Sequence, residues 1–280
     1  MLALSLPSSY LSGSTDLDTA FVWHSMLGPP ERALPDLAEL GVKAIEISDV
    51  RGQTEAAVVS RALLTVTDAG LLPHAHLYLP RGFDQARPPE PLIEAVRGLA
   101  RARNARQQLA ACAVHGHHRD SPEATAATVR DLRAVDAWLR EHGARAALEV
   151  CRFRPQGPIG GTYAEVLGLA RTAGDGIGLT WDVGHTTWNH QQGFDVAWPE
   201  ACFLERVRHV HVHAVGDTGR THFPLCRGRV PLEEFVERLR RVGYDGLWDL
   251  ELYPLRWSSS PADGRRALEA SISRLAEALA

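Results

Sequence analysis

The segment Leu-Thr-Trp-Asp-Val-Gly-His (179–185) is a short apolar run that ends in an acid and a histidine. Three more apolar runs end in the same way: Ala-Leu-Glu-Val (147–150), His-Val-His-Val-His (209–213) and Leu-Trp-Asp-Leu-Glu-Leu (247–252). Each has the length and composition of a buried β-strand. Burying an acid or an imidazole is costly unless a partner compensates for it. Four such strand ends in succession therefore predict one shared site, and their oxygen and nitrogen atoms suit a divalent ion such as Mn, Zn, Co or Fe.

Strand and helix patterns alternate along the whole chain. Strands are predicted at Leu2–Leu6, Val42–Ile47, Pro73–Leu79, Ala110–His115, Ala146–Cys151, Gly178–Asp182, Val207–His213 and Leu247–Leu252. Helices are predicted at Glu31–Leu40, Thr54–Ala69, Pro91–Leu109, Ser121–His142, Tyr163–Thr172, Leu232–Val242 and Pro261–Leu279, with a weaker one around Asp195–Arg206. Ser121 before Pro122 is expected to be an N-cap, and Gly41, Gly70, Gly143 and Gly243 follow predicted helix ends.

This alternation predicts parallel βαβ units. Eight such units with no change of composition predict a single domain, residues 1–280, folded as an α/β TIM barrel, the (β/α)8 fold, which commonly takes about 250 residues. The alternative, an open doubly wound sheet, more often carries a glycine-rich phosphate loop after its first strand. Residues 8–13, Ser-Ser-Tyr-Leu-Ser-Gly, show no such pattern.

Composition is ordinary for a soluble globular protein, with 45% hydrophobic and 23% charged residues. The net charge of −4 does not favour a protein that coats nucleic acid, although it leaves room for a local basic groove. The four cysteines are far apart and form no Cys-x-x-Cys pair, so neither a zinc knuckle nor a disulfide scaffold is indicated. The N-terminus does not have the pattern of a signal peptide, and no apolar stretch is long enough for a membrane span, so we expect a cytoplasmic protein.

A barrel places the carboxyl ends of its strands, and the loops that follow them, around the active site. The acids and histidines of this chain fall at those ends. On the seventh strand His209, His211 and His213 share one face, because side chains alternate with a period of two. That face is expected to point inward, since Val210 and Val212 would then pack against the outer helices. The full set of candidates is Glu46, His74, His76, His115, Glu149, Asp182, His185, His209, His211, His213 and Glu251.

These motifs resemble a known superfamily. They are Gly-Val-Lys-Ala-Ile-Glu-Ile (41–47), the histidines on strands three and four, Leu148-Glu149, Trp-Asp-Val-Gly-His (181–185), Val-His-Val-His (210–213), Gly-Arg-Val-Pro-Leu (228–232) and Gly-Tyr-Asp-Gly-Leu (243–247) before Leu250-Glu251. In this order the chain looks like the xylose-isomerase-like TIM barrels, the group of sugar isomerases and epimerases and of endonuclease IV. The resemblance runs from the second strand to the eighth and does not identify a substrate.

The resemblance implies a metal centre and a proton-transfer pair. In the ketose epimerases of the group, one divalent metal is held by a Glu, an Asp, a His and a Glu on strands five to eight. The two glutamates also move the substrate proton, and a further histidine lies beside the substrate. The residues that match are the metal ligands Glu149, Asp182, His211 and Glu251, the first and last of them also catalytic, and His185 beside the substrate.

The endonuclease relatives bind three zinc ions and use more ligands. His76, His115, His185 and His222 match four of these. The Asp expected two positions before the last histidine is Arg220 here, which removes a ligand and places a cation where the third metal would sit. A two-metal site stays open, and Arg220 could instead hold a carboxylate or phosphate of a substrate by a two-pronged contact.

Simpler interpretations compete with these roles. The four predicted ligands could form a buried salt-bridge network, but their strand ends offer no obvious Lys or Arg, and an uncompensated acidic cluster is costly. Glu46 could pair with an arginine at the barrel mouth as well as contact substrate. His117 and His118 are weaker candidates in the loop after the fourth strand. Trp23 and Trp188 could line a pocket or pack in the core.

The ligand set favours a divalent-metal-dependent isomerase or epimerase of a small sugar, sugar acid or cyclitol, acting through a metal-stabilised enediolate. We expect one divalent ion (Mn, Co, Mg or Zn), a small polyhydroxylated substrate, no nucleic-acid or membrane partner and, as often among such relatives, a homodimer. The alternatives are an endonuclease IV-like metal-dependent phosphodiesterase, a polyol dehydratase with the same site, and a barrel that binds a ligand without catalysis. The expected substrate contacts are Glu46, His76, His115, His185, His213, Arg220 and His222.

Overall fold

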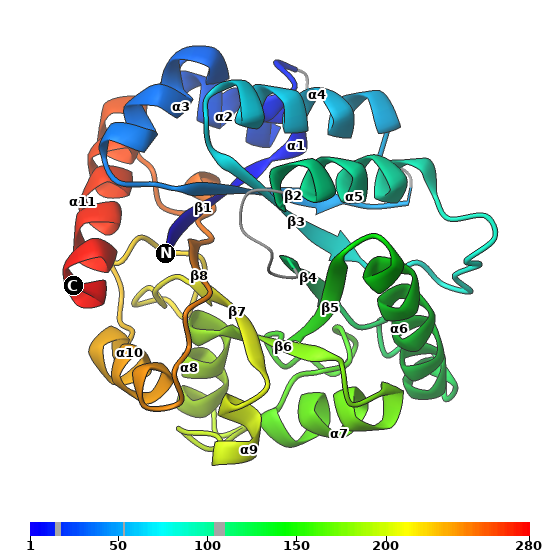
Figure 1. The fold of residues 1–280 in the computed structure, drawn as a ribbon. Coiled ribbons are helices and arrows are strands. Elements are labelled where there is room, and N and C mark those ends of the chain that lie inside the picture. Colours follow the sequence, from blue (N-terminus) through cyan, green and yellow to red (C-terminus); the bar gives the residue numbers. More distant parts are fainter. Residues whose placement is uncertain (15–17, 53, 104–109) are drawn as a thin grey trace.

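A closed barrel of parallel strands forms the centre of the molecule (Figure 1). The computed structural model describes residues 1–14, 18–52, 54–103 and 110–280. Each strand pairs with the next along the chain, and the last pairs with the first. The strands are β1 (Leu2–Pro7), β2 (Ala44–Val50), β3 (Leu72–Tyr78), β4 (Ala110–His115), β5 (Ala144–Glu149), β6 (Gly178–Asp182), β7 (Val207–Val212) and β8 (Leu247–Leu250).

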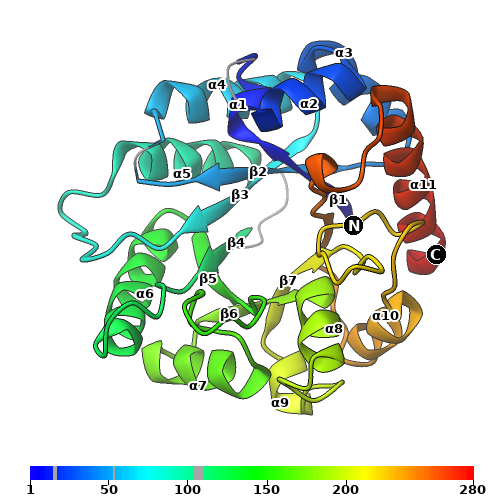
Figure 2. The ribbon, with the colours of Figure 1, turned by 180° about the vertical axis from the view of Figure 1, so that it is seen from behind.

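Helices surround the barrel on the outside, as the views from both ends show (Figures 1 and 2). They pack their apolar stripes against the outward-facing side chains of the strands. In chain order they are α1 (Ser8–Leu11), α2 (Asp18–Leu27), α3 (Pro30–Glu39), α4 (Ala56–Asp68), α5 (Glu90–Arg103), α6 (Ala124–Glu141), α7 (Tyr163–Ala173), α8 (Val183–Gln191), α9 (Ala201–Leu204), α10 (Leu232–Arg241), the 3-10 turn η1 (Pro254–Arg256) and α11 (Pro261–Leu279).

The predicted fold class is confirmed: all eight strands exist, and the chain folds as a single TIM-barrel domain. The helix prediction is wrong in two places: one predicted helix is much shorter than expected, and one helix, α8, was not predicted. The helix expected around residues 195–206 is only the short α9, and α8 begins directly after Asp182, whose carboxylate accepts a hydrogen bond from the His185 N–H at 2.6 Å. Ser121 does not cap α6, because residues 121–123 form a turn and the regular helix begins at Ala124. The end of the helix predicted at Pro91–Leu109, residues 104–109, lies outside the described residues.

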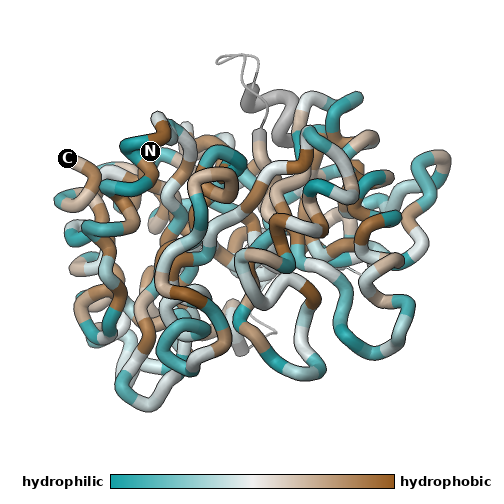
Figure 3. The backbone as a smooth tube through the Cα atoms, turned by 90° about the horizontal axis from the view of Figure 1, so that it is seen from below, coloured by the Kyte–Doolittle hydropathy of each residue, from teal (hydrophilic) through white to brown (hydrophobic). Residues whose placement is uncertain are grey.

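Glycine ends four helices as expected. Gly41, Gly70, Gly143 and Gly243 have φ angles of 97°, 73°, 78° and 71°, the left-handed region that suits glycine best. Hydrophobic residues run through the middle of the molecule and hydrophilic ones gather at its periphery (Figure 3). Within the part of the chain that the structure describes, no helix combines the length and apolarity that crossing a bilayer requires.

The barrel interior is polar at the carboxyl ends of its strands. His209, His211 and His213 are fully buried and face inward, while Val210 and Val212 are buried against the outer helices. Strand register brings the polar residues level, because Glu46 lies opposite His74 and Asp182 lies opposite His211. The fold therefore gathers acids and imidazoles from strands that are far apart in the sequence.

Candidate metal centre

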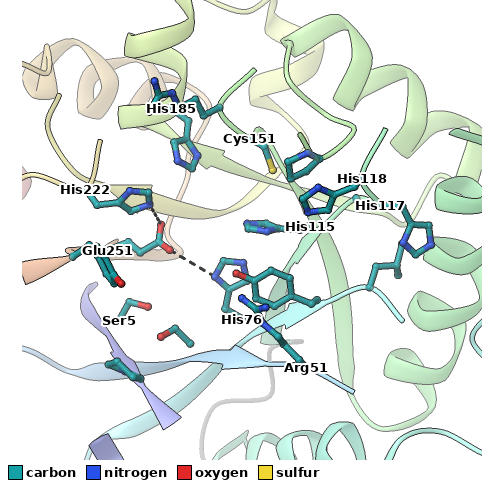
Figure 4. Close-up of a pocket in the computed structure, with 18 of the residues that line it drawn as sticks. Ser5, Arg51, His76, His115, His117, His118, Cys151, His185, His222 and Glu251 are labelled. Carbon is teal, nitrogen blue, oxygen red and sulfur yellow. Dashed lines mark ion pairs between the residues drawn. The ribbon is translucent and has the colours of Figure 1, made fainter. Parts of the chain in front are cut away.

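A cavity of about 1160 Å3 opens at the carboxyl ends of the strands (Figure 4). Its walls come from the ends of β1, β2, β3 and β4, from α2, and from the segments that follow the strands, those after β5, β6, β7 and β8 included. His76, His115, His185, His222 and Glu251 point into it. The floor of the cavity is thus the ring of strand ends at which the sequence predicted a site.

The four predicted metal ligands meet below this floor. Glu149, Asp182, His211 and Glu251 each offer one ligand atom, and these atoms all lie within 4.8 Å of one another. The His211 Nδ1 atom is 3.3 Å from a Glu149 oxygen and 3.6 Å from a Glu251 oxygen. The four side chains come from β5, β6, β7 and the residue after β8, so that each arrives from a different strand.

Several of these atoms have no hydrogen-bond partner, although they are buried. Among the described residues this holds for both carboxylate oxygens of Glu149, for Oε2 of Glu251 and for Nδ1 of His211. Leaving such groups unsatisfied is costly. A divalent cation would satisfy all of them at once, and the donor set of three carboxylates and one imidazole is the kind that such ions take. The residues present therefore fit a metal ion.

A second group of candidate ligands shares Glu149. The Nε2 atoms of His76 and His115 lie 3.3 Å and 3.1 Å from its Oε2 atom. Both nitrogens are buried and make no hydrogen bond to any described residue. His76, His115 and Glu149 each offer one ligand atom, and these three atoms also lie within 4.8 Å of one another. The site could hold a second ion beside the first.

A layer of polar side chains supports His211 from below. Glu46 is fully buried and accepts hydrogen bonds from the ring nitrogens of His74 and His211, both at 3.2 Å, and from the Ser5 hydroxyl at 3.1 Å. Because Nε2 of His211 donates to Glu46, its Nδ1 is the nitrogen that faces the predicted ligands. A carboxylate behind a ligating imidazole is a common way to fix the ring and its tautomer. Asp249, also in this layer, is fully buried with neither oxygen hydrogen-bonded to a described residue.

Asp182 is held from two sides. The N–H of His185 at the start of α8 donates to it, and Nε2 of His213 lies 3.1 Å from it. His213 Nδ1 accepts the backbone N–H of His222 at 3.0 Å, so its proton sits on Nε2, next to Asp182. Gly184 makes room for this ring, since a Cβ atom at Gly184 would lie 2.0 Å from the His213 ring.

His222 adopts a left-handed backbone, with φ of 62°, which among the described residues no other non-glycine shares. Its ring accepts a hydrogen bond at Nδ1 from Arg256 at 3.0 Å, and its Nε2 atom lies 3.4 Å from Glu251. His76 reaches the same carboxylate from the other side, at 4.0 Å (Figure 4). Strained backbone that surroundings hold in place is often found at functional sites. Glu251 is therefore positioned between two imidazoles at the cavity surface.

Electrostatics keep the acids of the site ionised. Burial alone would raise the pKa of Glu149, yet His115 and His211 hold it well below its usual value. Burial would likewise raise the pKa of Glu251, but His222 lowers it to about 2. Burial would lower the pKa of His211, but Glu46, Glu149 and Glu251 raise it well above its usual value. Glu149 and Glu251 are thus in the ionised form that binds a cation, whereas His211 would have to give up a proton to do so.

The remaining predicted contacts divide into two sets. His76, His115, His185 and His222 line the cavity, and His117 and His118 lie further up its wall. Glu46 and His213 are fully buried behind it, in positions that support other side chains. The ion pairs of Glu46 with described residues involve histidines, not the arginine considered as an alternative. Arg220 is not among the described residues that line the cavity.

The cavity also contains residues that the sequence did not single out. Arg51, Arg81, Arg152, Arg154 and Arg256 line its upper wall, together with Tyr78 and Cys151. Trp23, which the sequence offered for the pocket or the core, lines the cavity as well. All five arginines lie beyond the carboxyl ends of strands β2, β3, β5 and β8. In a TIM barrel the loops after the strands build the active site, so these arginines were possible candidates. The rule covers every loop residue, however, and gave no reason to choose these five.

A closed parallel barrel with acids and imidazoles gathered at the carboxyl ends of its strands defines the class of TIM barrels whose sites lie at that end. The model of the family described as "Xylose isomerase-like TIM barrel" matches residues 34–278, and the chain belongs to this family. An uncharacterised protein of Methanocaldococcus jannaschii is 26% identical over 129 residues, which are 43% of this chain and 41% of that protein. The match thus spans about two fifths of the length of that relative.

Solved structures with the same fold include a D-allulose 3-epimerase from a Methylomonas species. It is 18% identical, with a TM-score of 0.65 over 99% of this chain and 97% of its own. A D-psicose 3-epimerase from Clostridium cellulolyticum H10 is 14% identical, with a TM-score of 0.62 over 100% and 99%. A xylose isomerase-like TIM barrel protein from Mycobacterium smegmatis, in complex with magnesium, is 17% identical, with a TM-score of 0.57 over 91% and 90%. At these identities the likeness establishes the fold.

Proposed function

We propose that this protein is a divalent-metal-dependent isomerase or epimerase of a small polyhydroxylated carbonyl compound. One observation carries the proposal: Glu149, Asp182, His211 and Glu251 converge within 4.8 Å, with buried oxygens and a buried nitrogen that no described residue satisfies. The group lies directly below a cavity large enough for a sugar.

The solved relatives support the same direction. Two of the structures with a similar fold are named as a D-allulose 3-epimerase and a D-psicose 3-epimerase, two names for the same ketose, and another is described in complex with magnesium. In this chain, one metal ion would be held by Glu149, Asp182, His211 and Glu251.

The ion, when bound, would polarise a substrate carbonyl and stabilise the negative charge that forms when a neighbouring C–H bond loses its proton. The protein supplies the groups that move the proton. Glu251 lines the cavity with a side chain that is 19% exposed, whereas Glu149 is fully buried beneath His76 and His115. We therefore assign Glu251 to proton transfer at the open face and Glu149 to the opposite face, where a substrate would meet it once it displaces the covering histidines.

His185 and His222 complete the substrate side of the pocket. His185 lies 3.0 Å from Asp182 and is exposed to the cavity, which lets it contact a substrate hydroxyl. His222 is kept neutral, because burial and the neighbouring His213 lower its pKa to about 4. With Nδ1 accepting from Arg256, its proton sits on Nε2 and points at Glu251.

A second candidate function is a metal-dependent phosphodiesterase. The group of His76, His115 and Glu149 favours it, because a pair of metal ions is typical of enzymes that cleave phosphate esters. Arg220, in place of an acidic ligand, disfavours a third ion.

Metal analysis of protein purified without chelator tests both candidates. One ion per chain is expected for the isomerase, and two for the phosphodiesterase. Glu149→Gln and Asp182→Asn should leave the barrel folded, as judged by circular dichroism, and reduce metal content sharply. Full metal occupancy in both variants would refute the ligand assignment.

Exchange of solvent deuterium into ketoses tests the chemistry directly. The metal-loaded protein should introduce deuterium next to the carbonyl of its substrate, because the abstracted proton mixes with water. His185→Ala should abolish the exchange while one metal stays bound. If that variant instead loses its metal, His185 is a ligand and its assignment to the substrate is wrong.

A further inference from the structure

The upper wall of the cavity carries positive charge without matching negative charge. Arg152 and Arg154 follow β5, and Arg256 ends η1 after β8, so two separate loops bring them to the same cavity. Of these three guanidinium groups, none lies within ion-pair distance of a carboxylate among the residues described. By contrast, Arg81 on the same wall is paired with Asp120.

The local contacts hold these side chains without neutralising them. The guanidinium of Arg152 stacks on Trp188, with 3.8 Å from its central carbon to the ring centroid, and its buried Nε has no hydrogen-bond partner among the described residues. Arg256 donates to the Thr221 carbonyl at 3.2 Å and to His222. Trp188 and Thr221 thus aim the two arginines at the cavity.

The three charges lie close enough to repel one another. Burial, followed by Arg154 and Arg256, lowers the pKa of Arg152. Burial also lowers the pKa of Arg256, Arg154 and Arg220 add to the effect, and Tyr253 and Glu251 oppose it. A cluster of like charges in which Arg152 and Arg256 are partly buried and Arg154 is exposed favours an anion from outside. Arginine is also the side chain best suited to grip a planar or tetrahedral oxyanion through paired N–H groups.

We propose that the substrate carries an oxyanion group, a phosphate or a carboxylate, that binds to Arg152, Arg154 and Arg256. This inference rests on the proposed function and narrows its substrate class. The same cavity holds Glu251 and His76, beside which the carbonyl end of the molecule would lie. Two relatives with solved structures are named for one neutral ketose, D-allulose, which is also called D-psicose, so the arginine cluster would mark a different specificity.

The connection between the two ends runs through His222. Arg256 donates to its Nδ1 atom, and its Nε2 atom faces Glu251. An anion drawn to Arg256 would therefore lie one imidazole away from the proposed proton-transfer carboxylate. Binding energy from the anionic group would in this way position the reacting end.

The test compares matched ligands on the metal-loaded protein by isothermal titration calorimetry. The probes are D-fructose, D-fructose 6-phosphate, 5-keto-D-gluconate and inorganic phosphate. At least one of the two charged sugars should bind about tenfold or more tightly than D-fructose, since one charge-assisted hydrogen bond contributes about that much. Preference for the phosphate ester or for the keto acid identifies which oxyanion the cluster takes. Equal binding of D-fructose and both charged sugars, or no binding of any anionic probe, would overturn the proposal.

Two variants distinguish specific binding by the arginine cluster from a general effect of positive charge at the cavity mouth. Arg154→Gln should remove most of the preference for the charged sugar and leave metal content and thermal stability unchanged. Arg81→Gln removes the same charge from the same wall, but from a residue already paired with Asp120, and should keep the preference. Equal losses in the two variants would contradict a specific subsite.

The outcome also separates this proposal from the isomerase assignment. Selective anion binding that depends on Arg154, without deuterium exchange into any ligand, would support the anion subsite and refute the isomerase assignment. Deuterium exchange into neutral ketoses, with no preference for anions, would support the isomerase assignment and refute the subsite.

Discussion

At the scale of single residues, the site depends on side chains that never touch the cavity. Glu46 is the clearest case, because it is fully buried and accepts hydrogen bonds from His74, His211 and Ser5. Its hydrogen bond to Nε2 of His211 leaves Nδ1 to face the other proposed ligands. A residue of this kind controls the metal by orienting a ligand.

Glu46→Gln should therefore weaken metal binding without removing a ligand. Loss of a carboxylate behind a ligating histidine typically lowers metal affinity by about 10- to 100-fold. Competition with a fluorescent chelator measures the change. Glu165→Gln, which removes a carboxylate that bonds Arg119 instead, serves as the control and should leave affinity unaltered. Unchanged affinity in Glu46→Gln would show that His211 is held by packing alone.

Gly184 matters because of its neighbour. A Cβ atom there would lie 2.0 Å from the His213 ring, which must then move away from Asp182. Gly184→Ala should lower both metal content and the unfolding temperature. Gly168→Ala is the matched control: this glycine is exposed inside α7 with nothing within 4 Å of a new Cβ, so alanine should stabilise the protein by about 0.5–1 kcal/mol. Metal retained at full occupancy in Gly184→Ala would mean that His213 can shift without loss of the site.

At the scale of elements, the loop between β5 and α7 carries Arg152 and Arg154 and is anchored by Glu165. The carboxylate of Glu165 accepts the N–H groups of Gly160 and Gly161, at 3.0 Å and 2.8 Å, and pairs with Arg119. Burial would raise its pKa, but Arg119 and these two N–H groups lower it below 4.5, its usual value. The anchor is thus an ionised carboxylate at neutral pH.

The contribution of Glu165 should consequently depend on pH. Because its pKa is lower in the folded protein than in the unfolded chain, the stabilisation is complete above the unfolded value and is lost as pH falls through the folded one. Glu165→Gln should lower the denaturant midpoint at pH 7, and the gap to the parent protein should narrow as pH falls below about 4.5. A gap that stays constant between pH 7 and pH 3 would contradict an ionic anchor.

At the scale of the whole molecule, the barrel and the meeting of its strand-end acids and histidines were predictable from the sequence, because both follow from repeated patterns. Apolar runs marked the strands, and the acids and histidines that end β5 to β8 marked the site. The start of α8 was missed, since Val-Gly-His-Thr-Thr-Trp (183–188) has no apolar stripe and the helix depends on the cap from Asp182. The arginine cluster was missed because it joins loops about 100 residues apart, which only the closed barrel brings together.

The whole molecule is also expected to leave abasic DNA intact. Its net charge of −4 offers little release of counterions on binding a duplex, and Arg220 replaces an acidic ligand that a third metal would need. Incubation of the metal-loaded protein with a duplex that contains one abasic site should yield no strand cleavage. Efficient incision that disappears in His222→Ala would instead establish the phosphodiesterase.

Closure of the barrel has a consequence for how the protein is made. β1 pairs with β8, and the N-terminal ammonium group donates to the Gly246 carbonyl at 3.0 Å, so the first strand waits for the last. Glu251 lies just beyond that final strand. The ring can therefore close, and the acids at its strand ends can come together, only after residues 247–251 have left the ribosome. Until then the candidate site does not exist, because its parts lie on strands that have not yet paired.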